Sequence, residues 1–283
     1  MKLNSPSILI VGAGYLGEAL GLSLIKHGHA VSGIIRSEEK AVRLRSEGFN
    51  VYTADLKQAS TLKNIPYHDG VILCPSPGKN QTYEEIYLHG ISNILFQIKT
   101  WQKKPSFVIH VSSIGVWKNL QGKKTNEQTP VSREDAKSKI LIDSEQMTLG
   151  DKGGSGMILR LGGIYGPERN RIENFQKNLW PKSDSEDHYI NLIHREDAVS
   201  AIQRLMDKGI GGEIYIGVDD EPALESEIYK WFCDVTAQQK RKNPFSQLAV
   251  TSAGKRCQNT KLKALGWRPQ YPTFREGYRP LLP

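Results

Sequence analysis

The chain of 283 residues is long enough to bury most of its apolar surface without disulfides, as one large domain or as a core with an appended lobe. Its composition, 38% hydrophobic and 24% charged, excludes disordered and fibrous classes. The net charge of +8 fits an anionic partner, such as a phosphorylated ligand, an acidic membrane surface or nucleic acid. The basic residues are spread along the chain, so we do not expect a nucleic-acid surface.

The cysteines and the apolar runs indicate where the protein resides. Cys74, Cys233 and Cys257 form no CxxC pair and no disulfide framework, which is typical of reduced thiols. No apolar run approaches the roughly 18 residues that a membrane span needs, and no signal-peptide cleavage pattern follows the first run. The histidines lack HxxxH or HExxH spacing, so no metal site is expected. The sequence therefore predicts a cytoplasmic protein with no membrane segment.

The first half of the chain alternates strand and helix patterns. The run Ile8-Leu9-Ile10-Val11 is continuously apolar and ends in glycines, as a strand buried on both faces does. Further strands are predicted at 30–35, 50–54, 70–74, 107–111 and 157–161, with helices at 16–27, 38–47, 83–101 and 133–149. Repeated strand–helix units predict a parallel sheet with right-handed crossovers and helices on both faces.

After about Gly166 the alternation changes to charged loops, prolines and short helices, with one more strand at 213–216. We therefore predict an α/β fold: a Rossmann-like, doubly wound parallel sheet with a smaller C-terminal substrate lobe. Residues 1–166 form the dinucleotide-binding core in this prediction, and 167–283 form the lobe, of which 190–217 return to the core. Ligands of open α/β sheets bind at the carboxyl ends of the strands, which the lobe would cover.

The first strand runs into the glycine turn Gly12-Ala13-Gly14-Tyr15-Leu16-Gly17 and then into a helix. In this arrangement Gly12 allows a tight turn, Gly14 lets the backbone approach a pyrophosphate, and Gly17 lets helix and strand pack closely. The helix N-terminus presents free N–H groups and a positive dipole to the phosphates. We expect the turn, with Tyr15 and Leu16, to bind a dinucleotide; the alternative is a glycine-rich turn without a ligand.

The end of the second strand distinguishes the two nicotinamide cofactors. A carboxylate there would bind the ribose hydroxyls of NAD, but the sequence has Arg36 and Ser37. A guanidinium suits the 2′-phosphate of NADP through charge-assisted hydrogen bonds, so NADP is favoured and NAD is the alternative. The alternative is that Arg36 is only a surface arginine beside the start of a helix. Asp55, after the third strand, either meets the adenine end or caps the next short helix.

Several segments together carry a resemblance to a known family. They are the glycine turn, then 110–117 (HVSSIGVW), 159–167 (LRLGGIYGP), 190–197 (INLIHRED) and 265–269 (LGWRP). The chain resembles the extended and atypical short-chain dehydrogenases/reductases, also called the NAD-dependent epimerase/dehydratase family. The resemblance implies a Rossmann core, a nicotinamide cofactor, a small polar substrate such as a nucleotide sugar, and a homodimer paired through two long helices, here 83–101 and 133–149.

The resemblance also implies catalytic roles. Ser113 falls where the family keeps a serine or threonine that hydrogen-bonds the substrate oxygen; a strand-end serine that satisfies its own backbone is the alternative. The family's acid/base is a tyrosine four residues before a lysine, and none of the eleven tyrosines has a lysine there. One alignment makes Lys139 the family lysine, with Asp135 in place of the tyrosine. The other puts Lys137 and Leu141 at the two sites.

Three functions follow from these patterns. The first is an NAD(P)-dependent oxidoreductase or epimerase-like enzyme, indicated by the glycine turn and Ser113. The second is a non-catalytic protein that binds the dinucleotide as a sensor, indicated by the missing tyrosine. The third is nucleic-acid binding on a Rossmann fold, which only the net charge supports.

Overall fold

The computed structural model describes residues 6–150, 154–177, 179–180, 186–236, 245 and 249–282. The chain divides into two compact units that interleave along the sequence. The first unit comprises Met1–Val116, Ser132–Arg160 and Ala201–Tyr215, and the second comprises Trp117–Val131, Leu161–Ser200 and Ile216–Pro283. The domain boundary that the sequence places at residue 166 stays a prediction.

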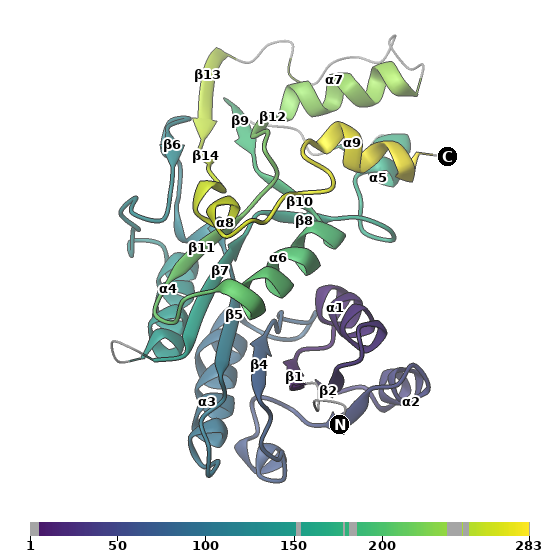
Figure 1. Cartoon of the computed structure of the whole chain (residues 1–283). Coiled ribbons are helices and arrows are strands. Elements are labelled where there is room, and N and C mark those ends of the chain that lie inside the picture. The colour runs from purple at the N-terminus through teal and green to yellow at the C-terminus, as the bar shows by residue number, and fades with distance from the viewer. Residues whose placement is uncertain are drawn as a thin grey trace. The chain divides into compact units, whose positions relative to one another are not determined.

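A seven-stranded sheet forms the centre of the first unit (Figure 1). Its order is β11-β7-β5-β4-β1-β2-β3, and the pairs from β5 to β3 are all parallel. The strands are β1 (Ser7–Val11), β2 (Ala30–Ile35), β3 (Asn50–Thr53), β4 (Gly70–Leu73), β5 (Phe107–Ser113), β7 (Gly156–Leu161) and β11 (Ile214–Gly217), the last two ending in the second unit. The predicted Rossmann-like fold class is confirmed.

Helices cover both faces of this sheet (Figure 1). On one face lie α1 (Tyr15–Lys26) and α2 (Glu38–Ser46), joined by ion pairs from Glu18 to Lys40 and Arg43. On the other lie α3 (Ile91–Lys99) and α4 (Ala136–Leu149), with the short helix η1 (Ala59–Leu62) against α3. The helix predicted at 83–101 begins as a π-helical turn, η2 (Glu85–Gly90), which continues into α3.

The strand order creates a crevice beside β1. Residues Ile8 to Val11 of this strand are completely buried, because β2 pairs on one side and β4 on the other while helices cover both faces. The chain leaves β1 toward β2 and β3 and returns across the sheet to β4, so the order reverses between β1 and β4. In open α/β sheets this reversal point is where ligands bind, at the carboxyl ends of the strands.

The second unit consists of small sheets and helices. Its strands are β6 (Lys124–Thr125), β8 (Gly163–Tyr165), β9 (Glu186–Ile190), β10 (Leu192–His194), β12 (Ala223–Leu224), β13 (Ala249–Gly254) and β14 (Arg256–Cys257). Its helices are α5 (Ile172–Gln176), α7 (Glu225–Val235), α8 (Thr260–Ala264) and α9 (Phe274–Tyr278), while α6 (Arg195–Lys208) runs from this unit into the first. Short 3-10 helices are η3 (Ile114–Val116) in the first unit and η4 (Arg279–Leu281) in the second.

The second unit has its own hydrophobic core of aromatic side chains. Phe175, Phe232, Phe274 and Tyr278 are completely buried, and Tyr165 stacks on Tyr278 with ring centroids 4.3 Å apart. Within the described ranges, no helix is both long and apolar enough to cross a membrane.

Candidate functional site

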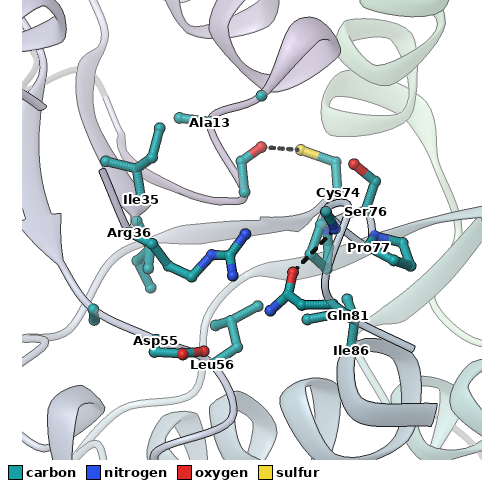
Figure 2. A pocket seen from close by; sticks show the side chains of 16 residues that line it. Ala13, Ile35, Arg36, Asp55, Leu56, Cys74, Ser76, Pro77, Gln81 and Ile86 are labelled. Carbon is teal, nitrogen blue, oxygen red and sulfur yellow. Dashed lines mark hydrogen bonds between the residues drawn. The ribbon is translucent and has the colours of Figure 1, made fainter. Parts of the chain in front are cut away.

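A pocket of about 280 Å³ lies at the carboxyl ends of β1, β2, β3 and β4, entirely within the first unit (Figure 2). Four segments line it, each at the carboxyl end of one of these strands. They are Gly12–Gly14, Ile34–Arg36, Ala54–Leu56 and the loop Cys74–Gly78 with Gln81 and Ile86. Gly12, Gly14, Arg36 and Asp55, four of the residues predicted to bind a dinucleotide, are therefore brought together from three parts of the sequence.

Gly12 makes the tight turn that the pocket requires. Its φ is +93°, and a Cβ at this position would fall 2.7 Å from the Cα of Pro75. The Sγ of Cys74 donates to the carbonyl of Gly12 over 3.4 Å, which joins the glycine turn to the end of β4. Burial raises the pKa of this thiol to about 12, so Cys74 is a neutral donor rather than a nucleophile.

Gly14 and Gly17 have different surroundings, which match their expected roles. A Cβ at Gly14 would meet nothing closer than the Gly12 carbonyl oxygen at 4.0 Å, so the space beside it is open. A Cβ at Gly17 would overlap that same oxygen and lie 3.0 Å from Cys74 Sγ. The N-cap of α1, which begins at Tyr15, is Gly14, which has no side chain to cap the first N–H groups. An open backbone and an uncapped helix N-terminus together fit a pyrophosphate.

The remaining predicted cofactor residues divide into two groups. Arg36 extends into the pocket, and no ion pair joins it to a residue that the structure describes (Figure 2). Asp55 lines the pocket, as its predicted place at the adenine end requires; its Oδ1 accepts a hydrogen bond from the Lys57 backbone N–H (3.0 Å), whereas the N-cap of the next short helix, η1, is Gln58. Ser37 caps α2 by accepting from the Lys40 N–H at 3.3 Å, and it does not line the pocket. Tyr15, Leu16 and Gly17 lie behind the lining, in α1.

The loop after β4 is the part of the lining that sequence reasoning missed. Pro75 and Gln81 reach the pocket because β4 pairs with β1, and the carboxyl ends of adjacent parallel strands lie at one edge. The signal was available in the predicted strand at 70–74 and the proline- and glycine-rich segment that follows it. This segment could be assigned to the pocket only once β4 was known to pair with β1.

Ser113 ends β5, two strands away from the glycine turn. Its Oγ accepts a hydrogen bond from the Gly115 N–H at 3.0 Å, the local backbone contact that a strand-end serine makes. This bond uses one lone pair and leaves the hydroxyl proton available to a substrate oxygen. Leu141 of α4 lies against the same turn, since a Cβ at Gly115 would fall 3.2 Å from Ser113 Oγ and 3.6 Å from Leu141 Cδ1.

A buried ion pair to β7 and hydrogen bonds to β5 and the turn after it fix how α4 is rotated against the sheet. Glu145 and Arg160 are 2% and 4% exposed at their side chains, with Arg160 Nη2 2.7 Å from Glu145 Oε2. The Ser112 hydroxyl also donates to Glu145, at 2.6 Å. At the first turn of the helix, the Ser138 hydroxyl donates to the Gly115 carbonyl over 3.0 Å. The face of α4 that meets the serine turn therefore carries Ser138, Leu141 and Glu145.

Lys139 lies on a different side of α4. Its side chain is 58% exposed and its Nζ pairs with Asp143 at 2.8 Å. Two residues along a helix correspond to about 200°, so Lys139 projects away from the direction of Leu141. Lys137 is also exposed, and its Nζ lies 5.4 Å from the centroid of the Tyr83 ring. The structure thus shows no contact between Ser113 and either lysine among the described residues.

Two other titratable groups, one in each unit, lie in packed surroundings. His110 is completely buried in β5, with Nδ1 3.0 Å from the Thr148 hydroxyl oxygen, and burial lowers its pKa to about 4. Tyr165, in the second unit, stacks on Tyr278, and burial raises the pKa of its phenol far above the ordinary value. Among the described residues, no group of three or more His, Cys, Asp or Glu side chains could hold a metal ion.

The comparison with known families agrees with this geometry. The family model described as NAD dependent epimerase/dehydratase matches residues 8–217, about three quarters of the chain. The chain belongs to this family. The match begins at β1 and ends at β11, so this epimerase/dehydratase family protein contains the whole sheet and the pocket within the matched range. The resemblance found in the sequence is confirmed, and with it a family that binds a nucleotide cofactor and small-molecule substrates.

Individual relatives support the same assignment. Protein YeeZ of Escherichia coli K12 is 27% identical over 215 residues, covering 74% of this chain and 76% of its own. A Methylobacillus flagellatus structure with the provisional name NAD-dependent epimerase/dehydratase is 27% identical, with a TM-score of 0.80 and coverage of 98% and 97%. The dTDP-glucose 4,6-dehydratase of Bacillus anthracis in complex with NAD has a TM-score of 0.78, 15% identity and coverage of 98% and 95%, which shows the shared fold.

Proposed function

We propose that this protein binds NADP(H) in the pocket beside Gly12 and acts on a small polar substrate, in the nucleotide-sugar class, as an oxidoreductase or epimerase. The observation that carries this proposal is the convergence of Gly12, Gly14 and Arg36 on one pocket at the reversal point of the sheet, with no ion pair from Arg36 to a described residue. Structural relatives that bind NAD or act on nucleotide sugars, such as the Bacillus anthracis dehydratase, support the substrate class.

The residues present fit a dinucleotide. The open backbone at Gly14 and the uncapped start of α1 would hold the pyrophosphate, and Arg36 with Asp55 would meet the adenosine end. When bound, the nicotinamide supplies hydride transfer to or from a substrate carbon. Arg36 gives the preference for NADP, because a guanidinium matches a 2′-phosphate and has no carboxylate partner in the described structure.

Ser113 would contact the substrate. Its hydroxyl proton is not needed by the bond that it accepts from Gly115, so it can donate to a carbonyl or alcohol oxygen. The residue that exchanges the proton is the open part of this proposal. Lys139, which the family alignment supplies, stays a prediction, because its side chain is exposed and paired with Asp143.

Titration calorimetry with NADPH and NADH tests the cofactor assignment. We expect the wild-type protein to prefer NADPH, and Arg36→Ala to remove that preference by weakening NADPH binding about tenfold or more while NADH is little affected. Arg45→Ala is the matched control, since Arg45 is an exposed arginine of α2 outside the pocket. If the wild type bound neither nucleotide, the proposed function would fail.

Turnover tests the catalytic part. A panel of nucleotide sugars is incubated with the protein and NADP+ or NADPH, and a product is followed by absorbance at the nicotinamide band and by chromatography. Ser113→Ala is expected to lower the rate about 100-fold with unchanged cofactor affinity. A rate that survives this substitution would remove Ser113 from the reaction.

A non-catalytic dinucleotide sensor is the second candidate. The observation in its favour is the first turn of α4, where Asp135 caps the helix by accepting from the Ser138 N–H at 2.9 Å and both nearby lysines point to solvent. This candidate predicts a strong preference between the oxidised and the reduced cofactor and no turnover on any substrate of the panel.

The assembly and location proposed from the sequence remain part of the same hypothesis. Phe96 of α3 and Met147 of α4 are 69% and 37% exposed on two helices that pack together, which supports a homodimer through this face. Sedimentation of the wild type and of Phe96→Asp tests the dimer, which the substitution should dissociate.

The absence of any disulfide among the three cysteines supports a reducing, cytoplasmic location.

A further inference from the structure

The side chain of Gln81 has a fixed orientation at the edge of the dinucleotide pocket. The Gly78 N–H donates to its Oε1 at 3.0 Å (Figure 2). Because a backbone N–H can only donate, the atom that it meets has to be the carboxamide oxygen. The Nε2 group, with its two donors, is therefore at the other end of the carboxamide.

That Nε2 group is buried and has no hydrogen-bond partner in the described structure. A buried donor without a partner costs roughly 1–3 kcal/mol, so such groups are rare unless something else satisfies them. Gln81 lines the dinucleotide pocket. Its Oε1 alone makes the bond to the Gly78 N–H, so its Nε2 is not needed to hold that loop. The unsatisfied donor thus indicates a partner that enters from the pocket.

Arg36 lies at the same point of the pocket. A Cβ at Gly78 would fall 3.0 Å from Arg36 Nη2 and 3.4 Å from Gln81 Oε1, so the guanidinium and the carboxamide border one small space. They extend into the pocket from different walls, one following β2 and the other following β4 (Figure 2). Gly78 leaves this space clear, because any side chain there would contact both groups.

The charges around this space favour an anion. Arg36 supplies a cation, and Gln81 supplies the unsatisfied donors. The acidic residue of the lining is Asp55, whose Oδ1 accepts from the Lys57 N–H. A phosphate has the oxygens to accept from the guanidinium and from a neutral amide at once, whereas a ribose hydroxyl would occupy only one of them.

We propose that Gln81 and Arg36 together form a phosphate subsite, so that Gln81 is a second residue that determines the preference for the 2′-phosphate of NADP. The inference rests on the proposed function and deepens it. The nitrogen has no exposed surface, so its partner arrives with a small movement of the lining. Arg36 is the exposed group beside it whose displacement would admit that partner.

The test replaces the donor without removing the acceptor. Gln81→Glu keeps an oxygen for the Gly78 N–H but places a negative charge and no donor in the subsite. We expect the affinity for NADPH to fall about tenfold or more, and that for NADH by less than about threefold. Gln102→Glu, the same charge change at an exposed position outside the pocket, is the matched control and should alter neither.

A second variant and a second ligand pair keep the test decisive. Gln81→Met removes the donor without adding charge and should weaken NADPH several-fold, which covers the case in which Gln81→Glu does not fold. Binding of adenosine 2′,5′-bisphosphate and of AMP, which lack the nicotinamide, is measured in the same variants. The affinity for the bisphosphate should fall as that for NADPH does, and the affinity for AMP should change as little as that for NADH. Equal losses for NADPH and NADH, or unchanged selectivity in both variants, would overturn the role of Gln81 while leaving the cofactor assignment intact. A wild type that binds neither nucleotide would overturn both.

Discussion

Two turns at strand ends of the same sheet differ in how well their residues converge. After β1, Gly12 and Gly14 meet Arg36 from β2 and Asp55 from β3 in one pocket. After β5, Ser113 accepts from its own turn, while Lys139 lies on the exposed side of α4 and pairs with Asp143. The residues proposed to hold a nucleotide therefore converge on one pocket, whereas Ser113 and Lys139, the residues proposed for catalysis, make no contact with each other in the described part of the chain. Binding and catalysis can therefore be separated experimentally.

The largest effect is expected at the ion pair that orients α4 beside Ser113. Glu145→Ala leaves Arg160 charged and buried, which should lower the free energy of unfolding by about 3–5 kcal/mol. Urea denaturation measures this loss. Asp143→Ala, on the exposed side of the same helix, is the control and should lose less than about 1 kcal/mol. A similar loss in both variants would mean that Glu145 does not position the helix.

The glycine turn provides the next largest effect. Gly12→Ala places a Cβ 2.7 Å from Pro75 Cα at a φ of +93°, so we expect about 3 kcal/mol or more of destabilisation and the loss of cofactor binding. Gly28→Ala also has a positive φ, +84°, but its Cβ would meet nothing within 4 Å. The Gly28→Ala variant should lose only about 1 kcal/mol of stability and bind the cofactor normally. Thermal unfolding and calorimetry compare the two, and equal behaviour would refute the packing argument.

The buried histidine of β5 gives a pH dependence. Burial lowers the pKa of His110 from its ordinary value of 6.5 to about 4, so the unfolded chain binds the proton more tightly. Stability should therefore fall as the pH drops from 6.5 toward 4, by about 2–3 kcal/mol from this group. His110→Gln should reduce this slope, and the exposed His89→Gln should not. An unchanged slope in His110→Gln would assign the acid sensitivity to other groups.

The smallest effect on stability is expected at Lys139. Its ion pair with Asp143 is exposed, so Lys139→Ala should change the free energy of unfolding by less than about 1 kcal/mol and leave cofactor affinity unaltered. Turnover decides whether Lys139 keeps its predicted catalytic role: an unaffected rate would fit its projection away from Ser113. A rate about 100-fold lower in a fully folded variant would instead make Lys139 the proton-exchanging residue.

The sequence predicted the fold because its strands are short apolar runs with glycines at their ends, and their order follows from regular crossovers. It predicted the pocket residues near β1 and β2 because these are local to the glycine turn. Gln81 was missed, since its place depends on β4 pairing with β1. The rotation of α4 was missed for another reason: its buried face carries Ser138, Ser144, Glu145 and Thr148, so apolar periodicity does not reveal it.

The contact between Cys74 and the glycine turn has a consequence for how the pocket can be probed. The thiol is held against the Gly12 carbonyl and beside Gly17, where burial keeps it protonated, yet it is partly exposed in the lining of the pocket. A thiol-modifying reagent can therefore reach Cys74 through the pocket, although it should react slowly because little thiolate is present. A nucleotide that fills the pocket would cover the sulfur, so the rate at which Cys74 is modified should report whether the pocket is occupied.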